Sequence, residues 1–235
     1  MLSTVRLIRR GMLFFIAAFF LFIFLFQMWV CAWIFWWKYM PVQSTTFMRS
    51  ELGRLQEKNS TAELKHLWVP YSQISVHLKR AVIAAEDANF PDHEGVDWEA
   101  IEAAHAKNKK RGKVVAGGST ITMQLAKNLF LSSQRSYIRK AEELVITYLL
   151  ETILDKQRIL EIYLNSVEWG IGVFGAQAAA QHYFGTTAAK LSPSEAARLA
   201  AMLPRPKFYD KNRRSGFLAK RSSAIERFMA DVDEP

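Results

Sequence analysis

An uninterrupted apolar stretch near the N-terminus constrains this sequence more than any other feature. No charged residue occurs from Gly11 to Trp37, and Phe, Leu, Ile, Trp and Ala dominate. Wound as a helix, the stretch would reach about 40 Å, which exceeds the roughly 30 Å of a bilayer's hydrocarbon core. We therefore expect residues 11–37 to form one transmembrane helix. A cleaved signal peptide is disfavoured because its apolar region is typically shorter and no small-x-small site closes this one.

The residues that flank this stretch predict how it crosses the membrane. Three arginines precede it, whereas only Lys38 follows closely, so the positive-inside rule places residues 1–10 in the cytoplasm and the remaining domain on the other side. Amphipathic rings favour the headgroup layer. They gather at the distal end of the stretch: Trp29, Trp33, Trp36, Trp37 and Tyr39.

The net charge of +9 and the pI of about 9.7 suit an anionic partner. Nucleic acid, anionic lipid and a phosphorylated substrate all fit such a charge. A dense basic segment from Lys107 to Lys113 reads as a solvated loop or as a contact for phospholipid headgroups. We expect no nucleic-acid partner, because the topology is outward and no aromatic residues interleave these lysines. The single cysteine, Cys31, excludes an intramolecular disulfide and a cysteine-based metal cluster.

Helical patterns fill most of the remaining chain. Residues 38–70 read as a membrane-proximal stalk that packs on the domain, and residues 71–235 as the domain itself. Ser75 can cap an apolar helix, and Ser192 with Glu195 forms a capping box followed by proline. Gly185 suits a helix C-terminus. Because no long Val/Ile alternation occurs, we expect a mainly α-helical fold.

A glycine-rich loop feeds one of these helices. Gly117 and Gly118 give a flexible backbone, and Ser119 and Thr120 are good N-cap residues. At about 100° per residue, four polar residues share one arc of the helix that follows. They are Thr120, Gln124, Lys127 and Asn128. A helix start that carries an ammonium two turns on suits an anion such as phosphate, although no Gly-Lys-Ser/Thr of a P-loop is present. An ordinary polar helix face is the alternative.

Two carboxylate motifs accompany this loop. Glu86 and Asp87 end an apolar helix, where desolvation would raise a carboxyl pKa toward that of a general base; a solvated pair is the alternative. Arg139 and Glu143 are spaced to face each other on a helix, with Lys140 adjacent. Two cations favour the charged form of Glu143, which suits it to orienting cations or to ligating a divalent metal rather than to acid catalysis.

The order and spacing of five blocks resemble the peptidoglycan glycosyltransferases, glycosyltransferase family 51, and specifically its monofunctional biosynthetic transglycosylases. The blocks are Glu86 to Gly95, Gly117 to Asn128, Arg139 to Glu143, Lys156 to Gly175, and Ala196 to Pro206. Bifunctional members of the family continue into a transpeptidase domain. No Ser-x-x-Lys region follows the last block here, so the resemblance implies the form with one activity.

The resemblance implies a lysozyme-like helical domain with a small jaw at about residues 99–135. The implied activity is polymerisation of lipid II into β-1,4 glycan by inverting transfer, with release of polyprenyl pyrophosphate. By position, Glu86 resembles the catalytic base and Glu143 the second essential carboxylate. Positions that resemble substrate contacts are Ser119, Thr120, Gln124, Lys127, Asn128, Arg139 and Lys140. Positions that resemble cleft-shaping residues are Asp87, Phe90 and His93.

The family also implies partners and a location. No cofactor is required; a divalent cation, Mg²⁺ or Mn²⁺, held by Glu143 is an option that the family suggests. The implied partners are lipid II, the growing lipid-linked glycan and membrane lipid, with other cell-wall synthesis or division proteins as candidates. The domain would face the periplasm from the bacterial inner membrane. A lysozyme-type lytic enzyme and a non-catalytic membrane-anchored scaffold are the two alternatives.

Overall fold

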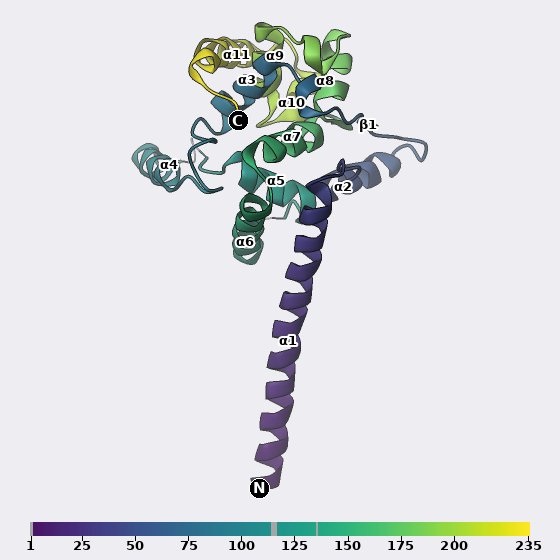
Figure 1. The fold of residues 1–235 in the computed structure, drawn as a ribbon, viewed down its shortest axis with the longest axis vertical. Helices are drawn as coiled ribbons and strands as arrows, with labels where there is room; N and C mark the ends of the chain where they lie inside the picture. The colour runs from purple at the N-terminus through teal and green to yellow at the C-terminus, as the bar shows by residue number, and fades with distance from the viewer. Residues whose placement is uncertain (1, 114–116, 135) are drawn as a thin grey trace.

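The structure, a computed structural model, describes residues 2–113, 117–134 and 136–235. One long helix, α1 (Leu2–Trp37), extends like a stem from a head formed by the rest of the chain (Figure 1). Its segment Arg9–Trp37 is long and apolar enough to cross a membrane, with a mean hydropathy of 2.5. Most of its described side chains are not covered by the rest of the protein, and the predicted apolar helix fits a single-pass membrane anchor.

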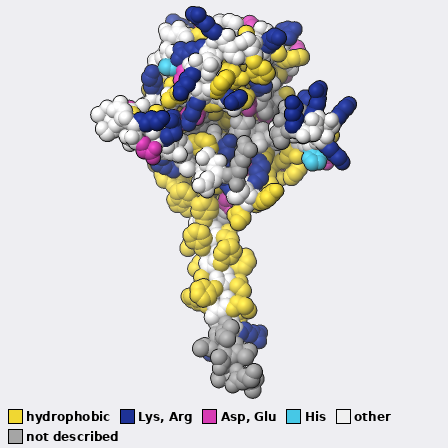
Figure 2. Space-filling view, turned by 180° about the vertical axis from the view of Figure 1, so that it is seen from behind, with side chains coloured by type: hydrophobic (Ala, Val, Ile, Leu, Met, Phe, Trp, Pro, Cys, Tyr) yellow, Lys and Arg dark blue, Asp and Glu magenta, His cyan; other side chains and the backbone are white. Residues whose placement is uncertain are grey.

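The distal end of α1 is part of the head. Val30 and Ile34 are fully buried in the core, and α1 packs against α6 (Tyr137–Ile153). The side-chain amide of Gln27 donates a hydrogen bond of 2.6 Å to Glu142 on α6. Hydrophobic side chains line the upper part of the stem and continue onto the adjoining underside of the head (Figure 2). The anchor is therefore docked on the domain, which limits the heights at which the head can stand above the bilayer.

The head is built mainly from helices, as the sequence predicts. In chain order they are α2 (Thr46–Gln56), α3 (Val76–Glu86), α4 (Trp98–Arg111), α5 (Ile121–Phe130), α6, α7 (Lys156–Ser166), α8 (Ala176–Phe184), α9 (Pro193–Met202), α10 (Pro206–Lys211) and α11 (Gly216–Phe228). Short 3-10 turns occur at Tyr71–Gln73, Ala188–Lys190 and Met229–Asp231. Three predicted caps are confirmed: Ser75 caps α3, Ser192 and Glu195 form the capping box of α9, and Gly185 ends α8 in the left-handed conformation.

A small sheet was not predicted. Its strands β1 (Lys65–His66), β2 (Glu168–Gly170) and β3 (Val173–Phe174) lie in the order β1-β3-β2. Strand β1 runs parallel to β3, and β2 runs antiparallel to it. Because β1 comes from the stretch 38–70 and α2 packs on α5, that stretch is tied into the head by main-chain hydrogen bonds as well as by side-chain packing.

Two groups of helices position the candidate site. In the first group, α9 packs against α3 and α11, and its buried alanines allow the close approach. In the second, α5 packs on α6 and α7. Helix α4 projects to one side of the head (Figure 1). The predicted jaw, residues 99–135, includes α4 and α5; residues 114–116 and 135 of that range lie outside the described residues, and the jaw boundaries stay a prediction.

Candidate active site

Glu86 is the last residue of α3 and lies mostly buried in the head. The apolar face of α3 is in the core, which fixes where the helix ends. The side chain of Glu86 is only 12% exposed, and its carboxylate accepts a 2.9 Å hydrogen bond from the side-chain amide of Gln124 on α5. Burial raises the pKa of Glu86, and the charge of Asp87 adds to this; Gln124, Arg221 and Lys127 act in the opposite direction. Glu86 therefore has the environment predicted for a general base.

The amide of Gln124 is held in one orientation. Its oxygen accepts a 3.0 Å hydrogen bond from the hydroxyl of Tyr163 on α7, which is fully buried. The amide NH₂ must then face Glu86. Helices α3, α5 and α7 thus meet at one chain of hydrogen bonds that ends on the Glu86 carboxylate.

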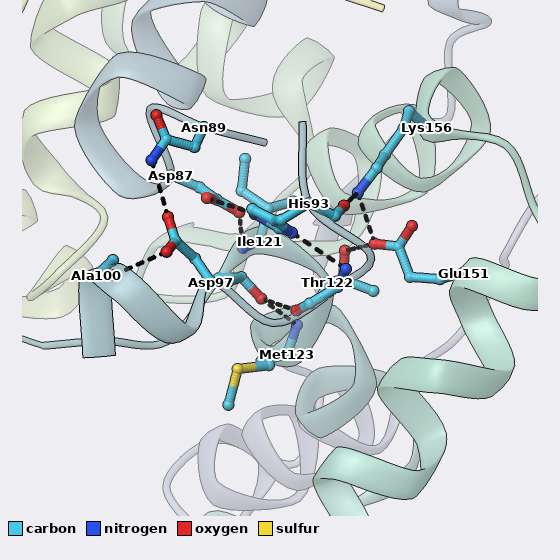
Figure 3. Close-up of polar contacts among 12 residues, drawn as sticks. Asp87, Asn89, His93, Asp97, Ala100, Ile121, Thr122, Met123, Glu151 and Lys156 are labelled. Carbon is cyan, nitrogen blue, oxygen red and sulfur yellow. Dashed lines mark hydrogen bonds and ion pairs between the residues drawn. The ribbon is translucent and has the colours of Figure 1, made fainter. Parts of the chain in front are cut away.

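The start of α5 is fixed by the neighbouring carboxylate, Asp87. One oxygen of Asp87 accepts the Ile121 backbone N–H at 2.9 Å, and the other accepts from His93 Nε2 at 2.8 Å (Figure 3). Thr120 is the N-cap residue of α5: its hydroxyl accepts from the Met123 N–H at 3.1 Å and donates to a backbone carbonyl at 2.6 Å. A carboxylate at a helix N-terminus is favourable. The residues after α3 therefore position α5.

The predicted cleft-shaping residues lie within a supporting network. Phe90 is fully buried, with the ammonium of Lys156 4.7 Å from its ring centre. Lys156 also pairs with Glu151 at 2.9 Å and donates to the backbone oxygen of His93. The hydroxyl of Thr122 donates to the same Glu151 carboxylate at 2.6 Å (Figure 3). These contacts hold the His93 loop between α5, α6 and α7.

A second carboxylate, Glu143 on α6, holds two cations. Its side chain is 4% exposed and accepts from Arg139 at 2.5 Å and, through its other oxygen, from Lys140. Lys140 also lies 3.4 Å from the hydroxyl of Ser119, in the loop before α5. The predicted pairing of Arg139 with Glu143 is confirmed. The start of α6 therefore faces the start of α5.

Lys127 lies one turn beyond Gln124 on α5 and is half-buried. Its ammonium lies 5.5 Å from the ring centre of Phe47, and it forms no ion pair with any residue that the structure describes. Burial lowers the pKa of Lys127; Glu143 and Glu86 oppose this, whereas Arg139 and Lys140 add to it. A partly desolvated cation without a protein counter-ion is suited to bind an anion from solution.

The remaining predicted residues are placed differently. Thr120 is 3% exposed and its hydroxyl is used within the protein, which confirms the predicted N-cap, while its contact with substrate stays a prediction. Asn128 is 7% exposed, whereas Ser119 lies at the surface. Of the two glycines before Ser119, Gly118 has a packing reason, because a Cβ there would come within 2.9 Å of the Ile101 Cα on α4, whereas a Cβ on Gly117 would meet nothing within 4 Å.

Two residues of the site were missed from the sequence. Arg221 on α11 places its guanidinium 3.6 Å from the Glu86 carboxylate, and Tyr163 orients Gln124. Both come from helices distant in sequence, and each reads locally as part of an amphipathic helix. No local pattern could have identified them.

The residues around Glu143 do not fit a resident divalent cation. Both of its carboxylate oxygens are bonded to cationic side chains, which would repel a metal ion. Among the residues that the structure describes, no group of three or more His, Cys, Asp and Glu side chains could hold a metal. The proposed chemistry therefore uses no metal step.

Comparisons with known proteins agree with this geometry. The family model described as Transglycosylase matches residues 52–230. A protein of Herminiimonas arsenicoxydans named biosynthetic peptidoglycan transglycosylase is 56% identical over 230 residues, covering 98% of this chain and all of that protein. Proteins of the same name from Janthinobacterium sp. (strain Marseille), with the same identity and coverage, and from Chromobacterium violaceum, 56% identical over 211 residues covering 90% of this chain and 92% of that protein, are also similar.

The family match and the helical head confirm the predicted lysozyme-like helical fold. The blocks on which the resemblance was based lie within the matched region. This chain belongs to the transglycosylase family.

Proposed function

We propose that this protein is a membrane-anchored peptidoglycan glycosyltransferase that polymerises lipid II into β-1,4-linked glycan. Family membership and the names of its relatives support the activity. The observation that carries the proposal is the shared face of α5. Gln124 on that face holds the buried Glu86, and Lys127, one turn on, has no counter-ion among the described residues. A base and an anion site thus lie along one helix.

The reaction requires a base for the attacking hydroxyl and positive charge that stabilises the leaving pyrophosphate. Glu86 takes the proton from the 4-hydroxyl of the acceptor sugar as that oxygen attacks C1 of the donor sugar. The bond from C1 to the pyrophosphate oxygen breaks, and the pyrophosphate leaves with the electron pair. Because the donor is α-linked and the product is β-linked, a single displacement with inversion is sufficient. No covalent enzyme intermediate is needed.

The leaving pyrophosphate needs positive charge rather than a proton. Lys127 supplies a charge that forms no ion pair with any described residue, and Arg139 and Lys140 add theirs at the start of α6. Glu143 fixes the positions of these two cations, since each oxygen is bonded to one of them. Preorganised charge in a partly buried site stabilises a developing anion more than solvent does.

The anchor confines the head to the surface where a polyprenyl-linked substrate lies. This raises the effective concentration of that substrate at the site. We place residues 1–10 in the cytoplasm and the head on the periplasmic face of the inner membrane, from the arginines that precede α1. Lipid II and the growing glycan chain are the partners that this arrangement serves.

The test is incubation of the purified full-length protein with sugar-labelled lipid II. We expect a high-molecular-weight product that muramidase digests, together with released polyprenyl pyrophosphate. A parallel incubation with preformed glycan distinguishes a lytic enzyme. Cleavage of that glycan without polymer formation from lipid II would contradict the proposal.

A further inference from the structure

A groove of about 380 Å³ lies where the membrane helix meets the head. Its walls are aromatic and aliphatic side chains from the last turns of α1 and the end of α5. They are Trp29, Trp33, Trp36, Trp37, Leu129 and Phe130. Its rim is polar, formed by Gln43, Ser44 and Arg49. None of these residues takes part in the proposed chemistry.

The walls are fixed in place but remain open. The ring of Phe130 packs on Trp29 and Trp37, with ring centres 5.8 and 5.4 Å apart. These contacts join α1 to α5. Trp33 and Trp36 nevertheless stay 40% and 55% exposed. The groove therefore presents a rigid apolar surface that the protein itself leaves uncovered.

Arg49, at the rim, has no ion-pair partner in the described part of the chain. Within that part, its guanidinium donates only to hydroxyl oxygens, that of Thr46 at 3.1 Å and that of Ser44 at 3.4 Å. No carboxylate pairs with it among the residues that the structure describes. An arginine offers five donors in a planar fork, so donors remain for an anionic oxygen.

The height of the groove indicates the ligand. The tryptophans form the last turns of a helix that can cross a bilayer, and such rings lie at the headgroup layer. The apolar walls then face the upper acyl chains, and Arg49 faces the phosphates. We propose that this groove binds an anionic phospholipid, with a chain against the tryptophans and the headgroup phosphate on Arg49.

Charge complementarity favours an anionic phospholipid over other membrane lipids. A zwitterionic headgroup brings its own ammonium, which competes with Arg49 for the phosphate. A polyprenyl pyrophosphate carries more negative charge than one guanidinium matches, and the cluster of Lys127, Arg139 and Lys140 offers it three cations. One basic side chain at a membrane surface gives about a fivefold preference for an anionic lipid.

Bound lipid would also support the end of α5. The backbone oxygen of Leu129 accepts a 2.9 Å hydrogen bond from Thr46, so the groove, α2 and α5 meet at one point. Leu129 lies two residues after Lys127. Lipid in the groove therefore stabilises the helix that carries the proposed anion site.

The experiment uses tryptophan quenching by brominated lipids. The full chain is reconstituted in phosphatidylcholine vesicles that contain a small, equal mole fraction of either brominated phosphatidylglycerol or brominated phosphatidylcholine. We expect an apparent affinity about fivefold higher for the brominated phosphatidylglycerol. Arg49→Gln should abolish this difference. Lys38→Gln removes a charge at a similar height but outside the groove, and should retain it.

Two results would overturn the proposal. One is equal quenching of the wild-type protein by the two brominated lipids, and the other is a headgroup preference that survives Arg49→Gln. A competition arm tests the choice of ligand. Polyprenyl phosphate that displaces the brominated phosphatidylglycerol more effectively than unlabelled phosphatidylglycerol would show that the groove belongs to the prenyl chain instead. The readout is lipid binding, so it is independent of glycan synthesis.

Discussion

Replacing Asp87 by asparagine tests whether this carboxylate fixes the start of α5. Its two oxygens accept from two different donors, the Ile121 N–H and His93 Nε2. His93 Nδ1 accepts from the Gly95 N–H at 3.1 Å, so the ring proton is on Nε2. An asparagine offers one oxygen. If that oxygen still accepts from the Ile121 N–H, the amide NH₂ faces the Nε2–H of His93, and two donors oppose each other. Moving the ring proton to Nδ1 would relieve this contact but would place an N–H against the N–H of Gly95.

The expected cost follows from these contacts. One charge-assisted hydrogen bond is lost in a site where the side chain is 3% exposed, which removes about 1.5–3 kcal/mol. The charge near the N-terminus of α5 contributes roughly another 0.5 kcal/mol. We expect the free energy of unfolding to fall by about 2–3.5 kcal/mol. For a domain of this size, this lowers the thermal midpoint by about 4–14 °C.

Circular dichroism of the protein in bilayer nanodiscs measures the midpoint. Asp92→Asn is the matched control, because Asp92 is an exposed carboxylate in the same loop. Its change should stay within about 0.5 kcal/mol. An Asp87→Asn midpoint indistinguishable from that of the control would refute the reasoning.

Three further predictions concern charge. Lys127→Ala should reduce the rate of polyprenyl pyrophosphate release by about 10²–10³, as expected for loss of a preorganised group that stabilises an anion; unchanged release would remove Lys127 from that role. Arg221 lowers the pKa of Glu86, so Arg221→Gln should move the acid limb of the kcat/KM profile to higher pH, and an unmoved limb would contradict the coupling. Burial raises the pKa of Glu168 from 4.5 to about 7, although the Lys207 ammonium lies 3.3 Å from its carboxylate. The stability that Glu168 contributes is therefore fully present below pH 4.5, where it is neutral, and is lost as the pH rises through 7. Glu168→Gln should therefore increase the free energy of unfolding above pH 7 and leave it unchanged well below pH 4.5; equal effects at both would show that the group does not titrate as stated.

Much of the fold could be predicted because its signals are local. The apolar run, the caps at Ser75 and Ser192, and the spacing of Arg139 and Glu143 each depend on neighbours within a few residues. The small sheet could not be predicted. Its strands are two or three residues long, and β1 pairs with residues more than a hundred positions away.

The site could be predicted only in part, because some of its contacts join residues that are distant in sequence. The pattern placed Gln124 and Lys127 on one face of α5, but the hydrogen bond from Gln124 to Glu86 was not predicted and is seen only in the structure. The contributions of Tyr163 and Arg221 arise from packing of α7 and α11, so only the folded chain reveals them. Thr120 was predicted both as an N-cap residue and as a substrate contact; the structure confirms the cap, and the substrate contact stays a prediction.

The most direct test of the central claim compares Glu86→Gln with Glu94→Gln, a change of an exposed carboxylate in the loop after α3. Both variants should match the wild-type circular dichroism spectrum. In the labelled lipid II assay we expect Glu94→Gln to form polymer at the wild-type rate. The rate of polymer formation by Glu86→Gln should be lower by about 10²–10⁴-fold, the usual contribution of a general base. Polymer formed by a folded Glu86→Gln variant at a rate near that of Glu94→Gln would contradict the claim that the buried carboxylate at the end of α3 activates the sugar hydroxyl.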